Sequence, residues 1–424
     1  MTTRPELPED ALEPVGLIRQ SGVVLRTGQL MLSAGTGSYR VKLAMQQVAH
    51  AIGVDRHTAH VTLTEITATS HRGPIFRTEV AEVRAVGVNA DRIARLEALA
   101  AELPPDSTVE DVNAALDEIE ARTPLYPAFA NALFAGVACA AFAFLNNGGL
   151  VECLSVLIAA TLGQWVRRAL LHRGFNRFGV TMIAAAVACV AYLAVIAVVD
   201  AVTRSTAVHQ AGYVSAVLFL VPGFALVTGA LDLAKLDFSA GVSRTVYALM
   251  ILTGSALSVW AVAVAAGLSI GSVPAMNLAP VLDLTLRALA SGCGVLGFAL
   301  MFNTPRRMAL TAAGIGMVGN VARLAMVDRG VVVQAATAIS CVVIGMLAAW
   351  AASWMKFPNI TLSVPAVLIM VPGVAAYRTV VSFNDGKMID ALANGVQGTF
   401  VVVSIVVGLV IAKILTDREW AFEK

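Results

Sequence analysis

The chain has 424 residues, of which 58% are apolar and only 14% are charged, and its mean hydropathy is +0.76. A soluble globular protein carries about 25% charged residues, so this composition excludes an ordinary soluble protein and requires that much of the chain face lipid. The formal net charge of +2 is too small to indicate a nucleic-acid partner. We therefore expect a polytopic α-helical membrane protein.

The N-terminal part of the chain differs in composition from the rest. Residues 1–14 are rich in proline and carboxylates and are expected to form a flexible tail. Residues 15–127 contain no apolar run near the ~20 residues that a membrane-spanning helix needs. They are expected to form a small α+β domain on the cytoplasmic side of the membrane.

Hydrophobic periodicity predicts both helices and strands in this domain. In chain order, the expected elements are helices within residues 16–51 broken at 32–40, strands at 61–69 and 75–83, and helices at 91–102 and 109–122. The two strands alternate apolar and polar residues, are rich in β-branched residues and flank a Gly-Pro turn, so we expect them to form a β-hairpin.

Two patterns in this domain resemble ligand sites. Residues 33–38, Ser-Ala-Gly-Thr-Gly-Ser, are similar to a phosphate-binding loop, but no Gly-Lys-Ser/Thr follows, so we do not predict phosphate binding. His57, His60 and His71 could join Glu65 in a metal site. Because no close-spaced third ligand completes that pattern, we expect surface histidines and no bound metal.

From residue 128 onward, long apolar segments follow one another almost without interruption, and hydropathy predicts ten membrane spans. They lie at residues 128–146, 150–170, 178–199, 212–231, 246–267, 281–302, 308–326, 331–354, 360–382 and 395–415. We group them into two modules of five helices each, residues 128–270 and 281–415, followed by a cytoplasmic tail at 416–424.

The two modules contain matching sequences. Residues 162–174 (Leu-Gly-Gln-Trp-Val-Arg-Arg-Ala-Leu-Leu-His-Arg-Gly) align with residues 318–330 (Val-Gly-Asn-Val-Ala-Arg-Leu-Ala-Met-Val-Asp-Arg-Gly). Five spans are an odd number, so the two copies should have opposite orientations, as in transporters built from inverted repeats. Lys and Arg concentrate in alternate connections, which independently predicts the same arrangement and places both termini in the cytoplasm.

Each module also has a Pro-Gly pair inside its fourth span. Pro222-Gly223 and Pro372-Gly373 lie about ten residues into those spans, where a proline removes a backbone donor and a glycine adds freedom. Each pair could be a simple kink. Alternatively, two half-helices could point their positive N-terminal ends at an anionic group of a solute.

Polar residues in or beside the spans are further candidates for a site, because polar groups in lipid are costly and are retained for function. For solute binding we select Asn131, Gln164, Asn320 and Tyr377 in addition to the two Pro-Gly pairs. For contact with a proton or an ammonium group we select Asp232, Asp237 and Arg244, which follow the first Pro-Gly pair.

Several of these residues belong to longer motifs that resemble a known family. Residues 30–40 (Leu-Met-Leu-Ser-Ala-Gly-Thr-Gly-Ser-Tyr-Arg) and residues 221–244 resemble the threonine/serine exporter family, and residues 371–378 are similar to its second membrane module. The resemblance covers residues 15–415. It implies ten spans, a cytoplasmic N-terminal domain and export of small hydroxy amino acids driven by the proton gradient. In a related branch the two modules are separate proteins linked to dicarboxylate export.

We therefore expect a secondary exporter of threonine and serine in the bacterial cytoplasmic membrane, coupled to protons, with no cofactor and with a homo-oligomer as one assembly state. A half-helix N-terminus would bind the carboxylate of the solute, and an aspartate would bind its ammonium group. One alternative is a dicarboxylate exporter of the same architecture. From a different class, a sensor or a membrane-anchored hydrolase with Ser33 or Ser38 as nucleophile is also considered.

Overall fold

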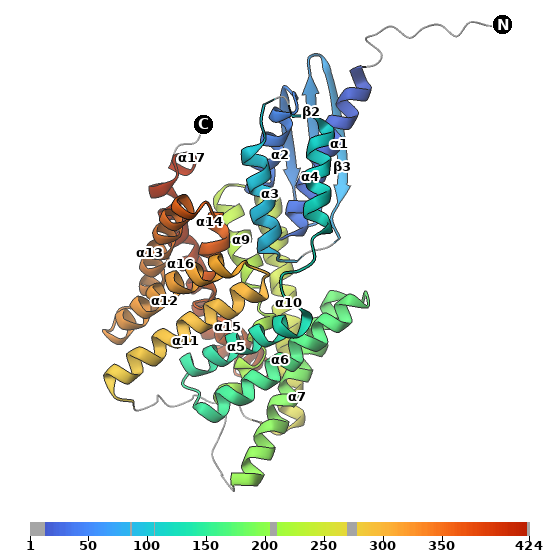
Figure 1. The fold of residues 1–424 in the computed structure, drawn as a ribbon. Helices are drawn as coiled ribbons and strands as arrows, with labels where there is room; N and C mark the ends of the chain where they lie inside the picture. Colours follow the sequence, from blue (N-terminus) through green and yellow to red (C-terminus); the bar gives the residue numbers. More distant parts are fainter. Residues whose placement is uncertain (1–12, 85–86, 106, 204–209, 269–277, 422–424) are drawn as a thin grey trace, which may run out of the picture. The chain divides into compact units, whose positions relative to one another are not determined.

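The computed structural model describes residues 13–84, 87–105, 107–203, 210–268 and 278–421, drawn as a ribbon in Figure 1. Internal contacts divide the chain into two compact units. The first comprises Met1–Thr123 and Leu231–Arg244, and the second comprises Pro124–Ala230 and Thr245–Lys424. Residues 231–244 lie inside the first predicted membrane module, yet their contacts group them with the N-terminal residues.

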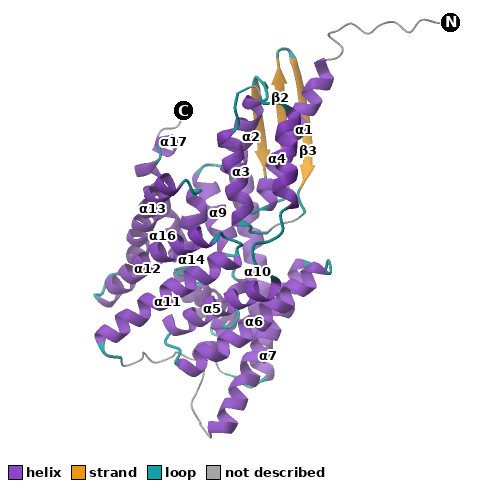
Figure 2. Cartoon of the chain, in the orientation of Figure 1, coloured by secondary structure: helices purple, strands orange, loops and turns teal. Residues whose placement is uncertain are grey.

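The first unit contains a three-stranded sheet and four helices, and Figure 2 shows its strands in orange. Its elements are α1 (Glu13–Ser33), α2 (Ser38–Ala51), β1 (Arg56–Val61), β2 (Glu65–Arg72), β3 (Ile75–Glu82), α3 (Ala90–Glu102) and α4 (Val109–Ala121). The sheet is antiparallel in the order β1-β2-β3. Helices α1 and α2 pack on the sheet, and α3 and α4 pack against α1 and α2.

The strand pair β2–β3 is the expected hairpin. Arg72 pairs with Ile75, so the turn consists of Gly73 and Pro74, and Gly73 has a φ of 54°, which favours glycine. Strand β1 was not predicted. Its side chains alternate between outward and inward positions, but the inward ones are His57, Ala59 and Val61, so the sequence has too little apolar character to identify a strand.

The two later helices of the first unit begin within one residue of their predicted positions because their capping residues are recognisable in the sequence. Asn89 accepts a hydrogen bond from the amide of Arg92 at the start of α3. Thr108 and Asp111 form a capping box at the start of α4. Between these helices and the sheet lies an apolar core that includes Met31, Met45, Ile66, Leu96 and Leu116.

The remaining elements are all helical. They are α5 (Ala128–Leu145), α6 (Leu150–His172), α7 (Arg177–Thr203), α8 (Gln210–Ser215), η2 (Leu218–Leu220), α9 (Gly223–Ala234), α10 (Phe238–Ala265), α11 (Pro280–Met301), α12 (Arg306–Asp328), α13 (Val333–Met355), α14 (Asn359–Leu368), α15 (Gly373–Asn384), α16 (Met388–Thr416) and α17 (Arg418–Ala421). Helix α9 begins in the second unit and ends in the first, and α10 does the reverse.

Among the described residues, eight helices are long and apolar enough to span a membrane, and two bent helix pairs raise the number to ten if each pair is one span. Many large apolar side chains on these helices are exposed, among them Ile389 on α16 and Val281 on α11. Exposed apolar surface of this extent is expected where helices contact lipid. The chain is therefore a multi-pass membrane protein.

The two bent pairs fall at the two Pro-Gly sequences. Residues Gly212–Leu220 meet Gly223–Ala234 at 58°, and Asn359–Leu368 meets Gly373–Asn384 at 49°. The amide of Gly223 donates to the carbonyl of Val221 at 2.8 Å, and the amide of Gly373 donates to the carbonyl of Val371 at the same distance. Both breaks therefore share this backbone hydrogen bond between a glycine amide and the carbonyl two residues earlier.

Candidate functional site

The two breaks contact each other reciprocally. A Cβ atom added to Gly223 would lie 2.6 Å from Cδ2 of Leu368, and one added to Gly373 would lie 2.7 Å from Cδ2 of Leu218. Leu368 lies 150 positions after Leu218, and Gly373 lies 150 positions after Gly223. A reciprocal pattern of this kind, in which i contacts j′ and i′ contacts j, is typical of a two-fold relation between the parts in contact.

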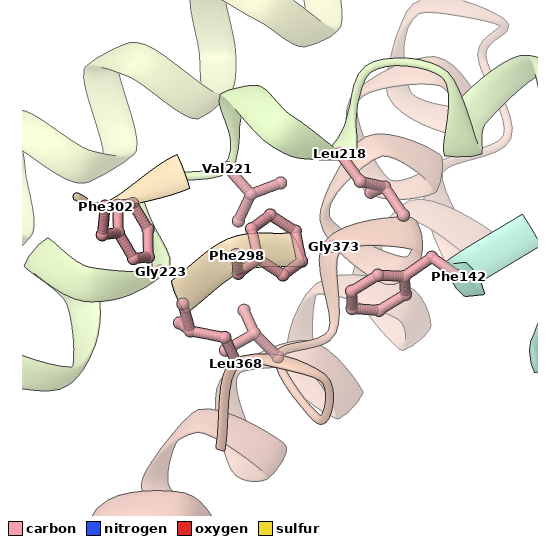
Figure 3. Close-up of a pocket in the computed structure, with 9 residues that line it drawn as sticks. Phe142, Leu218, Val221, Gly223, Phe298, Phe302, Leu368 and Gly373 are labelled. Carbon is pink, nitrogen blue, oxygen red and sulfur yellow. The ribbon is translucent and has the colours of Figure 1, made fainter. Parts of the chain in front are cut away.

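Matched residues from both halves also line a small cavity of about 20 Å³ between the breaks, drawn in Figure 3. The lining consists of the pairs Phe142 and Phe298, Leu218 and Leu368, Val221 and Val371, and Gly223 and Gly373, together with Phe302. The rings of Phe142 and Phe298 meet edge to face, with centroids 5.8 Å apart. A cavity of this size has room for about one water molecule, so in this conformation no solute fits between the two breaks.

A larger pocket of about 260 Å³ lies on one side of the second break. It shares Phe142, Val371 and Gly373 with the apolar cavity, so the two spaces adjoin. Its polar lining side chains are Arg323 on α12, Arg378 on α15, Asn394 and Gln397 on α16, and Asn146 at the end of α5. None of the described residues that line it is acidic.

The electrostatics of this polar pocket favour a carboxylate. Two guanidinium groups line one pocket that has no acidic side chain among its described residues, so an anion between them would compensate both charges. The Nε atom of Arg323 donates to the side-chain oxygen of Asn320 at 3.0 Å, which fixes its orientation and leaves its two terminal nitrogens for a further acceptor.

The start of helix α15 adds to the same field. Pro372, Gly373, Val374 and Ala375 all line the polar pocket, so the positive end of this half-helix faces the space that contains the two arginines. At the first break, Gly223 lines only the apolar cavity among the two pockets described, and Pro222 lines neither. Of the two pockets described, the polar one is bordered by a half-helix N-terminus from the second break alone, and a role for Pro222 and Gly223 in solute binding stays a prediction.

The predicted amide residues are buried in hydrogen-bonded clusters, one in each half. In the first, Nε2 of Gln164 donates to Oδ1 of Asn131 at 3.0 Å, and Arg167 donates to Oε1 of Gln164 at 3.3 Å. In the second, Nδ2 of Asn320 donates to the Ser291 hydroxyl at 2.8 Å. None of the three predicted amides lines either pocket, and Asn320 acts on the polar pocket only through Arg323.

Tyr377 also lies outside the lining of the polar pocket. Its side chain is fully buried, and its hydroxyl donates to Oγ of Ser255 at 3.0 Å. Tyr377 is not among the residues that line either pocket, whereas the next residue, Arg378, does line the polar one. A direct contact of Tyr377 with solute stays a prediction.

The three charged candidates lie in the first unit. Oδ1 of Asp232 accepts a hydrogen bond from the amide of Ser38 at 2.9 Å, and its other oxygen lies 3.2 Å from Nε of Arg244. Asp237 forms a salt bridge with Lys42. Neither aspartate is among the residues that line the two pockets described.

The site residues selected from the sequence include none of the five polar side chains that line the pocket. Asn394 and Gln397 are three positions apart in the apolar helix α16, so they lie on one face of it. That spacing is a usable signal, since paired amides at i and i+3 in an apolar span indicate a common polar environment.

Three other candidates in the first unit, His57, Ser33 and Ser38, are buried or hydrogen-bonded within that unit. His57 is buried rather than on the surface, contrary to the expectation, and its Nδ1 lies 3.0 Å from the Ser70 hydroxyl. Burial lowers the pKa of His57 from 6.5 to about 4. The Ser33 hydroxyl donates to the carbonyl of Leu30, and Ser38 is fully buried. Among the described residues, no group of three His, Cys, Asp or Glu could hold a metal.

Comparisons with known proteins bear on the whole chain. A family model described as "Putative threonine/serine exporter" matches residues 22–266, and a second one, described as "Threonine/Serine exporter, ThrE", matches residues 287–415. A protein from Klebsiella aerogenes named "Probable succinate transporter subunit YjjP" is 24% identical over 233 residues, which cover 54% of this chain and 87% of the relative. No solved structure is significantly similar to the chain.

Proposed function

The chain belongs to the threonine/serine exporter family, and we propose that it is a secondary active exporter of small hydroxy amino acids, threonine and serine, coupled to protons. The observation that carries this proposal is the polar pocket at the second break, which combines two arginines with three amide side chains and a helix N-terminus. Family membership supports the transport of a small solute, and the pocket supports a solute that has a carboxylate.

In the proposed mode of binding, Arg323 and the N-terminal end of α15 hold the carboxylate of the amino acid. Arginine is suited to this role because its planar guanidinium donates two parallel hydrogen bonds to one carboxylate. The side-chain oxygens of Asn146, Asn394 and Gln397 accept from the ammonium and hydroxyl groups. They replace the aspartates that the sequence suggested for the ammonium contact.

The apolar cavity between the breaks then acts as the barrier of the transport path. Phe142, Val371 and Gly373 belong to both spaces, so a solute in the polar pocket lies directly against this barrier. Passage requires the matched apolar pairs to separate, and the two helix breaks provide the backbone freedom for that motion. Two inverted modules of five helices would open the barrier to one side at a time.

The proposal includes the bacterial cytoplasmic membrane as location, with both termini in the cytoplasm and protons as the coupling ion. It also includes assembly beyond a monomer, since the Klebsiella relative is named a subunit. Molar mass in detergent by light scattering measures the assembly state of the purified chain. Alkylation of a single cysteine placed in the C-terminal tail of intact cells tests the predicted orientation.

Proteoliposomes that contain the purified chain test the transport activity. Labelled threonine should accumulate under an imposed pH gradient and should exchange with unlabelled serine in counterflow. Arg323→Gln should reduce this exchange. Arg168→Gln is the control, because Arg168 lines neither pocket, and it should leave the exchange unchanged. Absence of both pH-driven flux and counterflow with the wild-type protein would refute the proposal.

A dicarboxylate is the second candidate solute, and one specific observation favours it. The pocket has two arginines and no acidic residue among those described, so it can neutralise two carboxylates but offers no carboxylate to an ammonium group. The relative named as a succinate transporter subunit supports the same reading.

Arg378 separates the two candidates. If the solute is a dicarboxylate, Arg378→Gln should raise the KM for succinate about tenfold, because a charged contact with one of its two carboxylates is lost. If the solute is threonine, its single carboxylate is already held by Arg323, and the same variant should change the KM for threonine only about twofold. Competition between succinate and threonine in the wild-type protein gives the independent measurement.

A further inference from the structure

One charged cluster of the first unit has no part in the polar pocket. It joins residues 34–39, which connect α1 to α2, to the segment Leu231–Arg244, which contains the turn between α9 and α10 and is named the elbow below. Figure 1 shows α2 and α9 as separate elements far apart in the chain. The contacts between these two segments are polar, and those at their centre are buried.

The centre of this cluster is an ion pair. Asp232 and Arg244 are each only 2% exposed, and their side chains meet at 3.2 Å. Each also binds the backbone of residues 34–39, because Asp232 accepts from the amide of Ser38 at 2.9 Å and Arg244 donates to the carbonyl of Thr36 at 2.6 Å. Asp232 therefore occupies the N-terminus of α2, where a carboxylate is favoured.

Further contacts surround the ion pair. Lys42 forms a salt bridge with Asp237, and the ammonium of Lys235 lies 5.2 Å from the ring centroid of Tyr39. The chain at Gly37 passes so close that an added Cβ would be 3.1 Å from Oδ1 of Asp232. This close approach gives a physical reason for glycine at that position.

The corresponding turn between α15 and α16 has a different composition. Positions 150 residues further along carry Ser382 in place of Asp232, Lys387 in place of Asp237 and Asn394 in place of Arg244. Asn394 lines the polar pocket instead of forming an ion pair. The elbow therefore has the charges that bind residues 34–39, and the turn between α15 and α16 lacks the corresponding residues.

We propose that residues 34–39 clamp the elbow and thereby fix the position of α9 during transport, so that Asp232 and Arg244 are positioning residues of the transport cycle. Helix α9 runs without interruption from Gly223, which lines the apolar cavity, to Ala234 inside the elbow. A helix held at one end constrains the motion of its other end. The first unit thus controls how readily the barrier opens, an inference that rests on the proposed function.

The full-length protein in proteoliposomes tests the clamp. Asp232→Asn and Arg244→Gln should each lower the maximal flux about tenfold, a typical size for conformational coupling, while the KM for the solute stays within about twofold because the polar pocket is untouched. Gly37→Ala, which keeps both charges, should give a smaller loss of the same kind. Lys387→Gln, in the turn between α15 and α16, is the matched control and should leave the flux unchanged.

Hydrogen exchange on the same full-length variants gives a readout that needs no transported solute. Asp232→Asn should speed exchange at the amides of residues 36–39 and along α9, whereas Lys387→Gln should not. Unchanged exchange in the folded Asp232→Asn protein would overturn the clamp even if no flux is measured for the wild-type protein. Normal maximal flux in folded Asp232→Asn, or a raised KM with normal maximal flux, would overturn its role in transport while leaving the proposed function intact.

Discussion

The two halves of the second unit each contain a bent helix pair at a Pro-Gly sequence, but they carry different polar residues. At the breaks the halves are matched, with Leu218, Val221 and Gly223 equivalent to Leu368, Val371 and Gly373. Beyond the breaks they differ. Arg378 in the second half corresponds to Thr228 in the first, which is 1% exposed and donates to the carbonyl of Phe224.

This difference separates two roles. The residues that are equivalent in both halves line the apolar barrier, so each half presents the same kind of surface to the other there. Of the residues that differ, Arg378 and Asn394 line the polar pocket. Arg244, the counterpart of Asn394, belongs to the clamp, whereas Thr228, the counterpart of Arg378, bonds only within its own helix. We infer that the shared residues serve the mechanics of transport and that the unshared ones determine what is bound and how the motion is controlled.

The largest effect is expected from the arginine of α12. Arg323→Gln should lower flux about 100-fold, because a charged contact with the solute carboxylate is lost. Arg167, its equivalent in α6, binds Gln164 but does not line the polar pocket, so Arg167→Gln should lower flux much less. Flux measured on both variants checks the comparison, and equal losses would show that both halves bind solute alike.

The glycines of the two breaks should give the next largest effect. Gly223→Val and Gly373→Val should each lower the maximal flux about tenfold, because the added side chain overpacks the reciprocal contact with a leucine of the other half. The two losses should be similar, since the contacts are equivalent. Gly314→Val, at a position in α12 with nothing within 4 Å of an added Cβ, is the control.

A smaller effect is expected from the phenylalanine pair of the barrier. Phe142→Leu and Phe298→Leu each remove an edge-to-face ring contact at a cost of about 1 kcal/mol. We expect a few-fold rise in the passive leak of labelled solute from loaded vesicles without a pH gradient, and a similar rise for both variants. A leak confined to one of them would contradict an evenly shared barrier.

The smallest effect on transport is expected from His57, whose titration affects the stability of the first unit. The pKa of His57 is about 4 in the folded chain and 6.5 when unfolded, so stability is complete above pH 6.5 and falls as pH drops towards 4. Between pH 7 and pH 5 the loss should be about 2 kcal/mol. His57→Gln should flatten this dependence in thermal unfolding of the full chain, whereas the exposed His60→Gln should not.

Much of the secondary structure could be predicted from the sequence. The capping residues Asn89 and Thr108, the turn at Gly73 and the Pro-Gly pairs are local signals, and local chemistry alone explains why helices and strands begin or end there. The prediction failed at β1, whose polar sequence is paired only because β2 offers a strand edge to it.

The candidate site was less predictable because its residues come from distant parts of the chain. Pro372 and Gly373, which were selected from the sequence, line the polar pocket, whereas Asp232, which was selected for contact with an ammonium group or a proton, does not. Only the folded chain brings the amide of Ser38 and the guanidinium of Arg244 to that carboxylate. A buried charge is bound by whichever partners the fold places within a few ångströms of it.

The sequence by itself determined the membrane class, the two breaks and the family resemblance, since each depends on composition or on residues adjacent in the chain. The tertiary structure decided that the space between the breaks is apolar and that the polar pocket lies beside the second break. It also decided that the charged elbow belongs with the N-terminal unit. These outcomes depend on distances between residues more than 100 positions apart, which packing sets and local sequence does not.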